Sequence, residues 1–166
     1  MIKNVRLIFI LLLATSIFSV SFIGIDSHVE GLSVGDKAPY FTLHEDNGHD
    51  MNLKMLQGNL VLVSFWASYD ASSRIQNATL SHVIGKAANR IKMVSVSFDD
   101  YESIFKEAIK QDNISSENCY LVRIDRSSEL YKTYKIRKGF RNYLLNERGE
   151  IVAKDITPSQ LKAYFN

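Results

Sequence analysis

The chain has almost no cysteine. Cys119 is the only one among 166 residues, so no disulfide bond can form within one chain, and a mechanism that uses two thiols of the same chain is excluded by counting. The stability of the folded protein must therefore come from the packing of its side chains.

The chain also has little net charge. Twenty basic and eighteen acidic side chains leave a formal charge of +2, whereas proteins that bind nucleic acid concentrate basic side chains on one surface. We therefore expect no nucleic acid partner. Apolar residues make up 46% and charged residues 23% of the chain, which is typical of a globular protein. The length fits one domain.

The N-terminal residues 1–25 differ from the rest of the chain. Lys3 and Arg6 precede an apolar run at 7–25 that is interrupted only by small residues, as in an export signal. This run is longer than the apolar part of most signal peptides and close to the about 20 residues that span a membrane. Residues 1–25 are therefore predicted to be a signal peptide or an uncleaved signal anchor. Either would place the domain outside the cytoplasm, periplasmic or secreted, with possible membrane attachment through 7–25.

A single domain is predicted for residues 33–166, after a polar linker at 26–32. Continuous β-branched and aromatic runs predict strands, and apolar residues spaced three and four apart predict helices. The predicted strands are 60–66, 91–98, 120–124, 142–145 and 150–153, and the predicted helices are 70–88, 101–109, 127–134 and 158–165. Residues 40–43 and 50–53 flank a turn-rich segment and predict a β-hairpin. Strands that alternate with helices predict an α/β domain with a mixed central sheet and helices on both faces.

Three segments of this domain resemble one family. Residues 33–43, SVGDKAPYFTL, resemble the opening of the TlpA-type thiol-disulfide oxidoreductases and peroxiredoxins (AhpC-TSA) of the thioredoxin-like superfamily. Residues 58–68 resemble the strand that leads into their active site, and residues 134–152 resemble their closing hairpin. The resemblance covers 33–166 and implies a thioredoxin-like fold, with the hairpin at 40–53 as an N-terminal extension.

The resemblance implies a degenerate active site in this chain. In the family a Cys-x-x-Cys sequence follows this strand, at the start of a helix. Asp70 stands where the nucleophilic cysteine is expected, Ser73 stands where the resolving cysteine is expected, and Arg74 keeps the family's basic position. Neither a carboxylate nor a hydroxyl can replace the thiolate that attacks a disulfide. The chain is therefore predicted to be redox-inactive and to need no cofactor.

A second family landmark is replaced at Phe140. The family carries a cis-proline there, which faces the two cysteines and shapes the groove for an extended substrate. Because a cis bond before a non-proline residue costs about 2.5–4 kcal/mol, a trans bond is predicted before Phe140. We expect an altered surface that binds an unknown protein or peptide in the cell envelope. Its predicted residues are Trp66, Tyr69, Asp70, Arg74, Gly139 and Phe140.

Some of these residues have other interpretations. Asp70 suits a helix N-cap, and a ligand or catalytic role is the alternative. Cys119 is either a small apolar residue or a functional thiol, which would support oxidoreductase or peroxiredoxin-like antioxidant activity, alone or with a partner's thiol. His44 and His49 flank an acidic turn, but they lack the spacing of structural zinc ligands, so we expect no metal. A module that binds a small ligand or a metal at the helix start is a third hypothesis.

Overall fold

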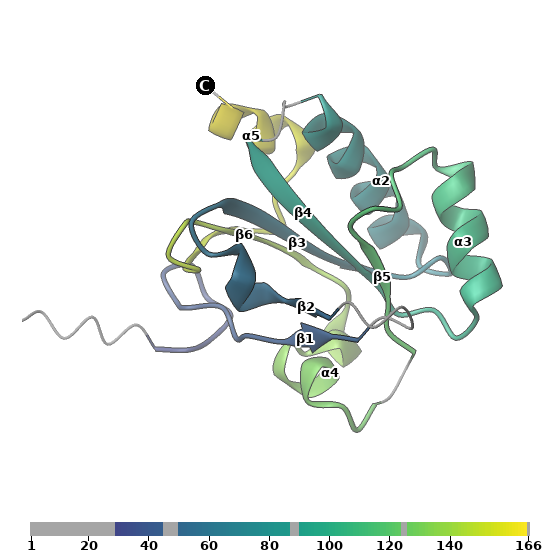
Figure 1. Cartoon of the computed structure of the whole chain (residues 1–166), viewed down its shortest axis with the longest axis horizontal. Helices are drawn as coiled ribbons and strands as arrows, with labels where there is room; N and C mark the ends of the chain where they lie inside the picture. Colours follow the sequence, from purple (N-terminus) through teal and green to yellow (C-terminus); the bar gives the residue numbers. More distant parts are fainter. Residues whose placement is uncertain (1–28, 45–49, 87–89, 124–125, 166) are drawn as a thin grey trace, which may run out of the picture.

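The computed structural model describes residues 29–44, 50–86, 90–123 and 126–165 (Figure 1). The predicted signal segment at 1–25 lies outside these residues, as does His49. No helix in the described ranges is both long and apolar enough to cross a membrane.

A five-stranded mixed sheet forms the centre of the domain, with the strand order β5-β4-β3-β6-β7 (Figure 1). The central strand β3 runs parallel to β4 and antiparallel to β6. Six of its seven residues are buried, as its continuous β-branched and aromatic sequence predicts. The strands are β3 (Leu60–Trp66), β4 (Ile91–Ser97), β5 (Cys119–Leu121), β6 (Asn142–Leu145) and β7 (Ile151–Lys154).

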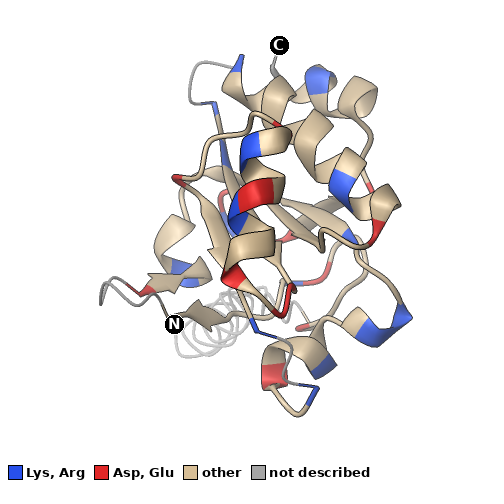
Figure 2. Ribbon diagram, turned by 90° about the vertical axis from the view of Figure 1, so that its right-hand side faces the viewer, with Lys and Arg blue, Asp and Glu red and all other residues tan. Residues whose placement is uncertain are grey.

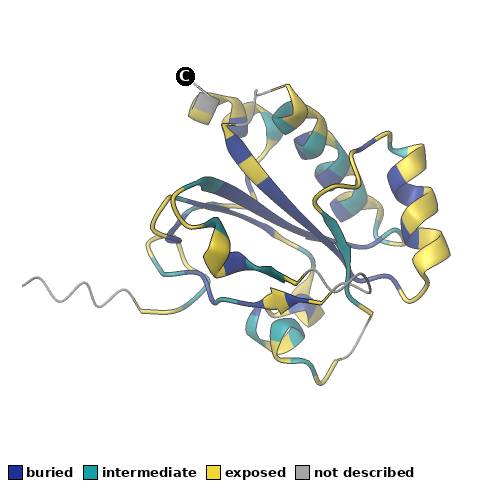
Figure 3. Ribbon diagram, in the orientation of Figure 1, coloured by how far each residue is buried: buried dark blue, intermediate teal, exposed yellow. Residues whose placement is uncertain are grey.

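Helices cover both faces of the sheet, as predicted. The helices α2 (Ala71–Gly85), α3 (Glu102–Gln111) and α5 (Pro158–Lys162) lie on one face, and α4 (Glu129–Thr133) lies on the other (Figure 1). Successive side chains of β3 point to opposite faces, so Leu62 packs with α2 and α5 while Phe65 packs with α4. The predicted hairpin, β1 (Thr42–Leu43) and β2 (Met51–Asn52), packs on the α4 face. Figure 3 shows β3, β4 and β6 largely buried between these layers.

Several elements differ from their predicted bounds. β5 begins at Cys119, which the sequence pattern places at the end of a loop. The helix predicted at 127–134 is shorter, and an unpredicted 3-10 turn η2 (Ile136–Lys138) follows it. Lys135 separates the two because its φ of 53° lies in the left-handed region and interrupts the helix. The closing helix also ends early and continues as a 3-10 turn η3 (Ala163–Phe165).

Residues 29–32, which the sequence pattern assigns to the linker, form part of the domain. The backbone N–H of Lys37 donates to the carbonyl of Val29 at 3.1 Å, and Leu32 packs against the core. The neighbouring Gly35 N–H donates to the carbonyl of Ile151 in β7 at 2.9 Å. Residues 29–32 therefore pair with the segment around Lys37, and residues 35–37 in turn pair with the outer edge of β7 at Ile151, whose backbone groups would otherwise be unpaired.

Candidate functional site

The helix α2 begins just beyond the carboxyl end of β3, and Asp70 caps its first turn. Oδ1 of Asp70 accepts a hydrogen bond from the backbone N–H of Ser73 at 2.8 Å, and Ser73 Oγ donates to the Asp70 carbonyl at 3.2 Å. Ser73 is buried, and its Oγ also accepts from the N–H of Ala67 at 3.4 Å. The N-cap interpretation of Asp70 is confirmed. The two residues at the expected cysteine positions are therefore hydrogen-bonded to each other.

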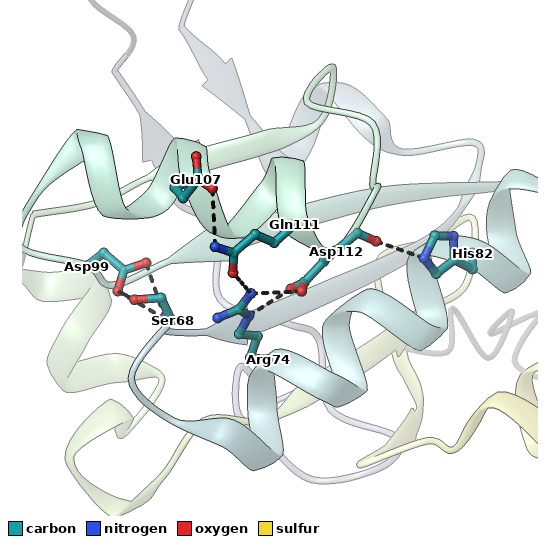
Figure 4. Close-up of polar contacts among 7 residues, drawn as sticks. All are labelled: Ser68, Arg74, His82, Asp99, Glu107, Gln111 and Asp112. Carbon is teal, nitrogen blue, oxygen red and sulfur yellow. Dashed lines mark hydrogen bonds and ion pairs between the residues drawn. The ribbon is translucent and has the colours of Figure 1, made fainter.

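A buried carboxylate that the sequence motifs do not single out holds the loop before α2. Asp99 follows β4 and accepts hydrogen bonds from Ser68 Oγ at 2.6 Å and from Ser68 N–H at 3.0 Å (Figure 4). Ser97 Oγ also donates to Asp99, at 2.6 Å. Because β3 and β4 are parallel, the residues that follow them meet at one edge of the sheet. Asp99 directly follows the strand predicted at 91–98, and this position in the sequence could have indicated that its carboxylate lies beside the loop before α2.

An aromatic cluster lies beside the helix start. The ring of Phe140 lies against Tyr69, with centroids 6.2 Å apart and planes at 62°, and it stacks on Phe98 at 6.1 Å and 29°. Tyr131 of α4 contacts Phe98 from its edge at 6.0 Å. Peptide bonds within the described residues are all trans, so the trans bond predicted before Phe140 is confirmed. The structure thus brings Tyr69, Gly139 and Phe140 to the vicinity of Asp70.

Trp66 does not contribute to this surface, and its assignment there is wrong. Its side chain is fully buried, at 0% exposure. The indole Nε1–H donates to Ser95 Oγ at 2.8 Å, and the ring packs against Phe105 of α3. The physical reason is the alternation along β3, which directs Trp66 into the layer beneath α3 and away from solvent.

Arg74 is bonded to α3 instead of facing Phe140. Its Nε and Nη2 donate to the two carboxylate oxygens of Asp112, each at 2.8 Å, and Nη2 also donates to Gln111 Oε1 at 3.0 Å (Figure 4). The hydrogen bond to Asp112 is the main reason that the pKa of Arg74 is raised. His82 Nε2 lies 2.9 Å from the carbonyl oxygen of Asp112. Arg74 therefore joins α2 to the C-terminal end of α3, and Asp112 compensates its charge.

Cys119 lies apart from the helix start. It pairs with Ser95 of β4, which in turn pairs with Ser64 of β3, so two strand spacings, about 9–10 Å, separate it from the central strand. Its Sγ donates to the Ser115 carbonyl at 3.1 Å. Burial raises the pKa of its thiol, and a hydrogen bond with Ser95 partly offsets this. The single thiol is not placed beside Asp70 and Ser73.

The described residues hold no group of three His, Cys, Asp or Glu side chains close enough for a metal ion. His44 is one of the two histidines considered for such a site, and its Nδ1 lies 2.9 Å from Oδ2 of Asp50. The acidic turn between His44 and His49 lies outside the described residues.

A mixed sheet with helices on both faces, and a helix that starts at the end of its central strand opposite the Phe140 loop, define a thioredoxin-like protein. The chain belongs to the AhpC/TSA family, whose model matches residues 34–154. The resemblance found in the sequence motifs is confirmed, and so is the fold class.

Curated relatives and solved structures agree with this family. The chain is 23% identical over 164 residues to the thiol-disulfide oxidoreductase ResA from Bacillus cereus. The aligned residues make up 96% of this chain and 92% of ResA. A thioredoxin-like protein from Parabacteroides distasonis is 36% identical with a TM-score of 0.69, covering 82% of this chain and 97% of the other. The thioredoxin domain of a thiol-disulfide oxidoreductase from Bacteroides vulgatus is 25% identical with a TM-score of 0.69, covering 82% and 100%.

Proposed function

We propose that this protein is a redox-inactive member of its family that binds a protein or peptide in the cell envelope. The observation that carries the proposal is the pair of hydrogen bonds between Asp70 and Ser73. Thiol-disulfide exchange needs one thiolate to attack and a second thiol to resolve the mixed disulfide. A carboxylate and a hydroxyl occupy these positions, and both are used to close the first turn of α2.

The proposed binding surface consists of Tyr69, Asp70, Gly139 and Phe140. The side chain of Tyr69 is 65% exposed, and Phe140 supports it from the side. Exposed tyrosine suits an interface because its ring supplies contact area while its hydroxyl remains hydrogen-bonded to water or to a partner. Arg74 lies at the edge of this surface, where it stabilises the helix start without facing Phe140.

A second candidate function is thiol-dependent oxidoreductase or antioxidant activity through Cys119. One observation favours it: Cys119 is only partly buried and lines a groove of about 1190 Å³ between α3 and β5. Two observations weigh against it. A lone thiol needs a partner's thiol to resolve a mixed disulfide, and the raised pKa of Cys119 lowers the fraction of reactive thiolate.

Two assays distinguish these functions. Full-length protein in detergent would be tested for insulin reduction with dithiothreitol as the electron donor, and for consumption of hydrogen peroxide. Redox inactivity predicts that both rates equal the blank and that Cys119→Ser changes neither. A rate above the blank that disappears in Cys119→Ser would establish the second candidate instead.

The envelope location rests on the charged and apolar pattern of residues 1–25 together with membership of the family. Membrane fractionation and mass spectrometry of the N-terminus test it. We expect either a membrane-associated chain that retains residues 7–25 or an exported product that has lost them. A soluble cytoplasmic product that starts at Met1 would contradict the proposed location.

A further inference from the structure

Basic side chains gather on the segment that joins α4 to the Phe140 loop. Residues 132–138 have the sequence KTYKIRK, which contains four basic residues and no acidic residue. These four charges are twice the formal charge of the whole chain, +2, so the rest of the chain is net negative. Figure 2 shows basic residues on α4 and on the turn that follows it, at the bottom of the view. The four residues are Lys132, Lys135, Arg137 and Lys138.

Two successive backbone turns hold these residues close together. The N–H of Lys135 donates to the carbonyl of Lys132 at 3.1 Å, and the N–H of Lys138 donates to the carbonyl of Lys135 at 2.8 Å. Tyr134 and Ile136 lie between them, are buried and anchor the segment to the core. The four basic side chains are exposed. The fold therefore presents four positive charges along about 10 Å of helical backbone.

The chain does not pair these charges with carboxylates of its own. Other basic side chains of the described residues do form ion pairs, among them Arg74 with Asp112. None of the four basic side chains at 132–138 forms an ion pair with a described residue. Glu129, in the first turn of α4, adds one exposed negative charge against four positive ones. This segment is therefore a positive surface that remains available for a partner.

The carboxylates nearest to the aromatic cluster belong to other segments. Asp70 precedes α2, and Asp99 and Asp100 follow β4, whereas residues 132–138 lead directly into Phe140. The first two carboxylates already accept hydrogen bonds from the chain, and Asp100 is exposed. The side of the proposed binding surface that adjoins Phe140 is therefore the basic one.

We propose that the partner presents an acidic segment to residues 132–138, with its Asp or Glu side chains against Arg137 and Lys138 and one apolar side chain against the ring of Phe140. Complementary charge selects such a segment, and the planar guanidinium of arginine can bind a carboxylate through two hydrogen bonds. This inference rests on the proposed function, because it names the chemistry of the partner bound at that site.

The aromatic rings beside the basic residues favour a peptide as the occupant. Phe140 is half-buried, and its ring lies against the exposed ring of Tyr69 with centroids 6.2 Å apart. The two rings give a single apolar side chain a contact next to the positive charges. A membrane surface attracts basic residues by charge alone, so it would make no use of this arrangement.

The test is a calorimetric titration of the full-length protein in detergent with three synthetic peptides that have blocked ends. The first has the sequence Gly-Glu-Phe-Glu-Glu-Phe-Glu-Gly. In the second, glutamine replaces each glutamate, and in the third, glycine replaces each phenylalanine. We expect the first peptide to bind at least about tenfold more tightly than the second, with an affinity that falls as salt is added. The third should bind about threefold more weakly than the first, because it lacks the contact with Phe140.

Two double variants with the same change of charge locate the binding. Arg137→Gln with Lys138→Gln should weaken binding of the first peptide by about tenfold, because two of the four positive charges are removed. The matched control is Lys54→Gln with Lys110→Gln, which removes two exposed charges from η1 (Leu53–Leu56) and α3. The control should bind the first peptide as the unmodified protein does. All four side chains are exposed, so circular dichroism should show both variants folded.

Several outcomes would overturn the inference. These are equal affinity for the first and second peptides, equal affinity for the first and third, and equal loss of binding in the two double variants. The same calorimetry with micelles that contain phosphatidylglycerol tests a lipid occupant. Heat that disappears in the Arg137 and Lys138 variant, without binding of the first peptide, would identify anionic headgroups as the ligand and overturn the acidic segment.

Insulin reduction is independent of this titration. Turnover there would contradict the proposed redox inactivity, whereas a failed titration overturns only the chemistry assigned to the partner.

Discussion

At the scale of single residues, Asp70 shows how a reactive position becomes a structural one. Its carboxylate accepts the backbone N–H of Ser73, which has no acceptor within the first turn of the helix. The negative charge also suits the positive end of the α2 dipole. The group that occupies the expected nucleophile position therefore contributes to helix stability, and its oxygen atoms cannot attack a disulfide in place of sulfur.

Replacement of Asp70 tests this structural role. We expect Asp70→Ala to lower the free energy of unfolding by about 0.5–2 kcal/mol, because the cap is lost, and Asp70→Ser to lower it by less, because serine is also a preferred N-cap. Urea denaturation followed by circular dichroism measures both. Equal losses for the two variants would show that the cap contributes little to stability.

The reactivity of Cys119 is a second prediction at this scale. Burial raises the pKa of the thiol, so at a given pH the thiolate fraction is smaller than that of an ordinary cysteine. Alkylation by iodoacetamide at pH 8, followed by mass spectrometry, should be at least about tenfold slower in the native protein than in urea. The native rate should also rise as the pH is raised above the ordinary thiol pKa. Equal native and denatured rates would favour the functional thiol.

At the scale of elements, the junction of α2 and α3 depends on a pair of residues far apart in the sequence. The guanidinium of Arg74 forms two hydrogen bonds with the Asp112 carboxylate, and only 26% of the Arg74 side chain and 18% of the Asp112 side chain are exposed. On the other side of the helix start, Asp99 holds Ser68. Asp112 therefore holds the first turn of α2 through Arg74, and Asp99 holds the loop just before that turn through Ser68.

A double-mutant cycle on Arg74→Ala and Asp112→Ala measures this junction. We expect a coupling free energy of about 1–2 kcal/mol, since hydrogen bonds to charged groups are strong and partial exposure weakens them. The exposed pair of Glu102 and Lys106 is the matched control. Its coupling should be smaller and should vanish at high salt. Equal coupling in the two pairs would show that the junction does not stabilise the fold.

At the scale of the whole molecule, the family's architecture persists although a carboxylate and a hydroxyl occupy the expected cysteine positions. Over 82% of its length the chain matches a solved thioredoxin-like structure of 36% identity with a TM-score of 0.69. The chemistry depends on a few side chains at the edge of this scaffold, so fold similarity does not transfer the reaction. Replacing those side chains should therefore recover part of the activity.

Thiols placed at the helix start test this conclusion. Asp70→Cys with Ser73→Cys should reduce insulin faster than the unmodified chain when dithiothreitol supplies electrons, because the N-terminus of α2 lowers the pKa of the first thiol. Adding Phe140→Pro should raise the rate again, since it removes the ring that lies against Tyr69. Asp70→Cys alone is the control and should show no turnover. If the unmodified chain matches the triple variant, its redox inactivity is disproved.

The sequence determined the fold class and most of the elements, because those depend on local patterns. The run at 60–66 has too many β-branched and aromatic residues to be anything but a buried strand, and it forms one with those bounds. Asp70 at a helix start specifies its own cap. The single cysteine excluded a dithiol mechanism within one chain without any structure.

Only the tertiary structure decided which way side chains point and which distant residues meet. Trp66 and Tyr69 look alike as aromatic residues before a helix, yet strand alternation buries the first and the turn that follows exposes the second. Arg74 meets Asp112 from another helix, and Phe140 meets Phe98 from another strand end. No local pattern encodes these contacts, because they arise only when the sheet brings its strand ends and covering helices together.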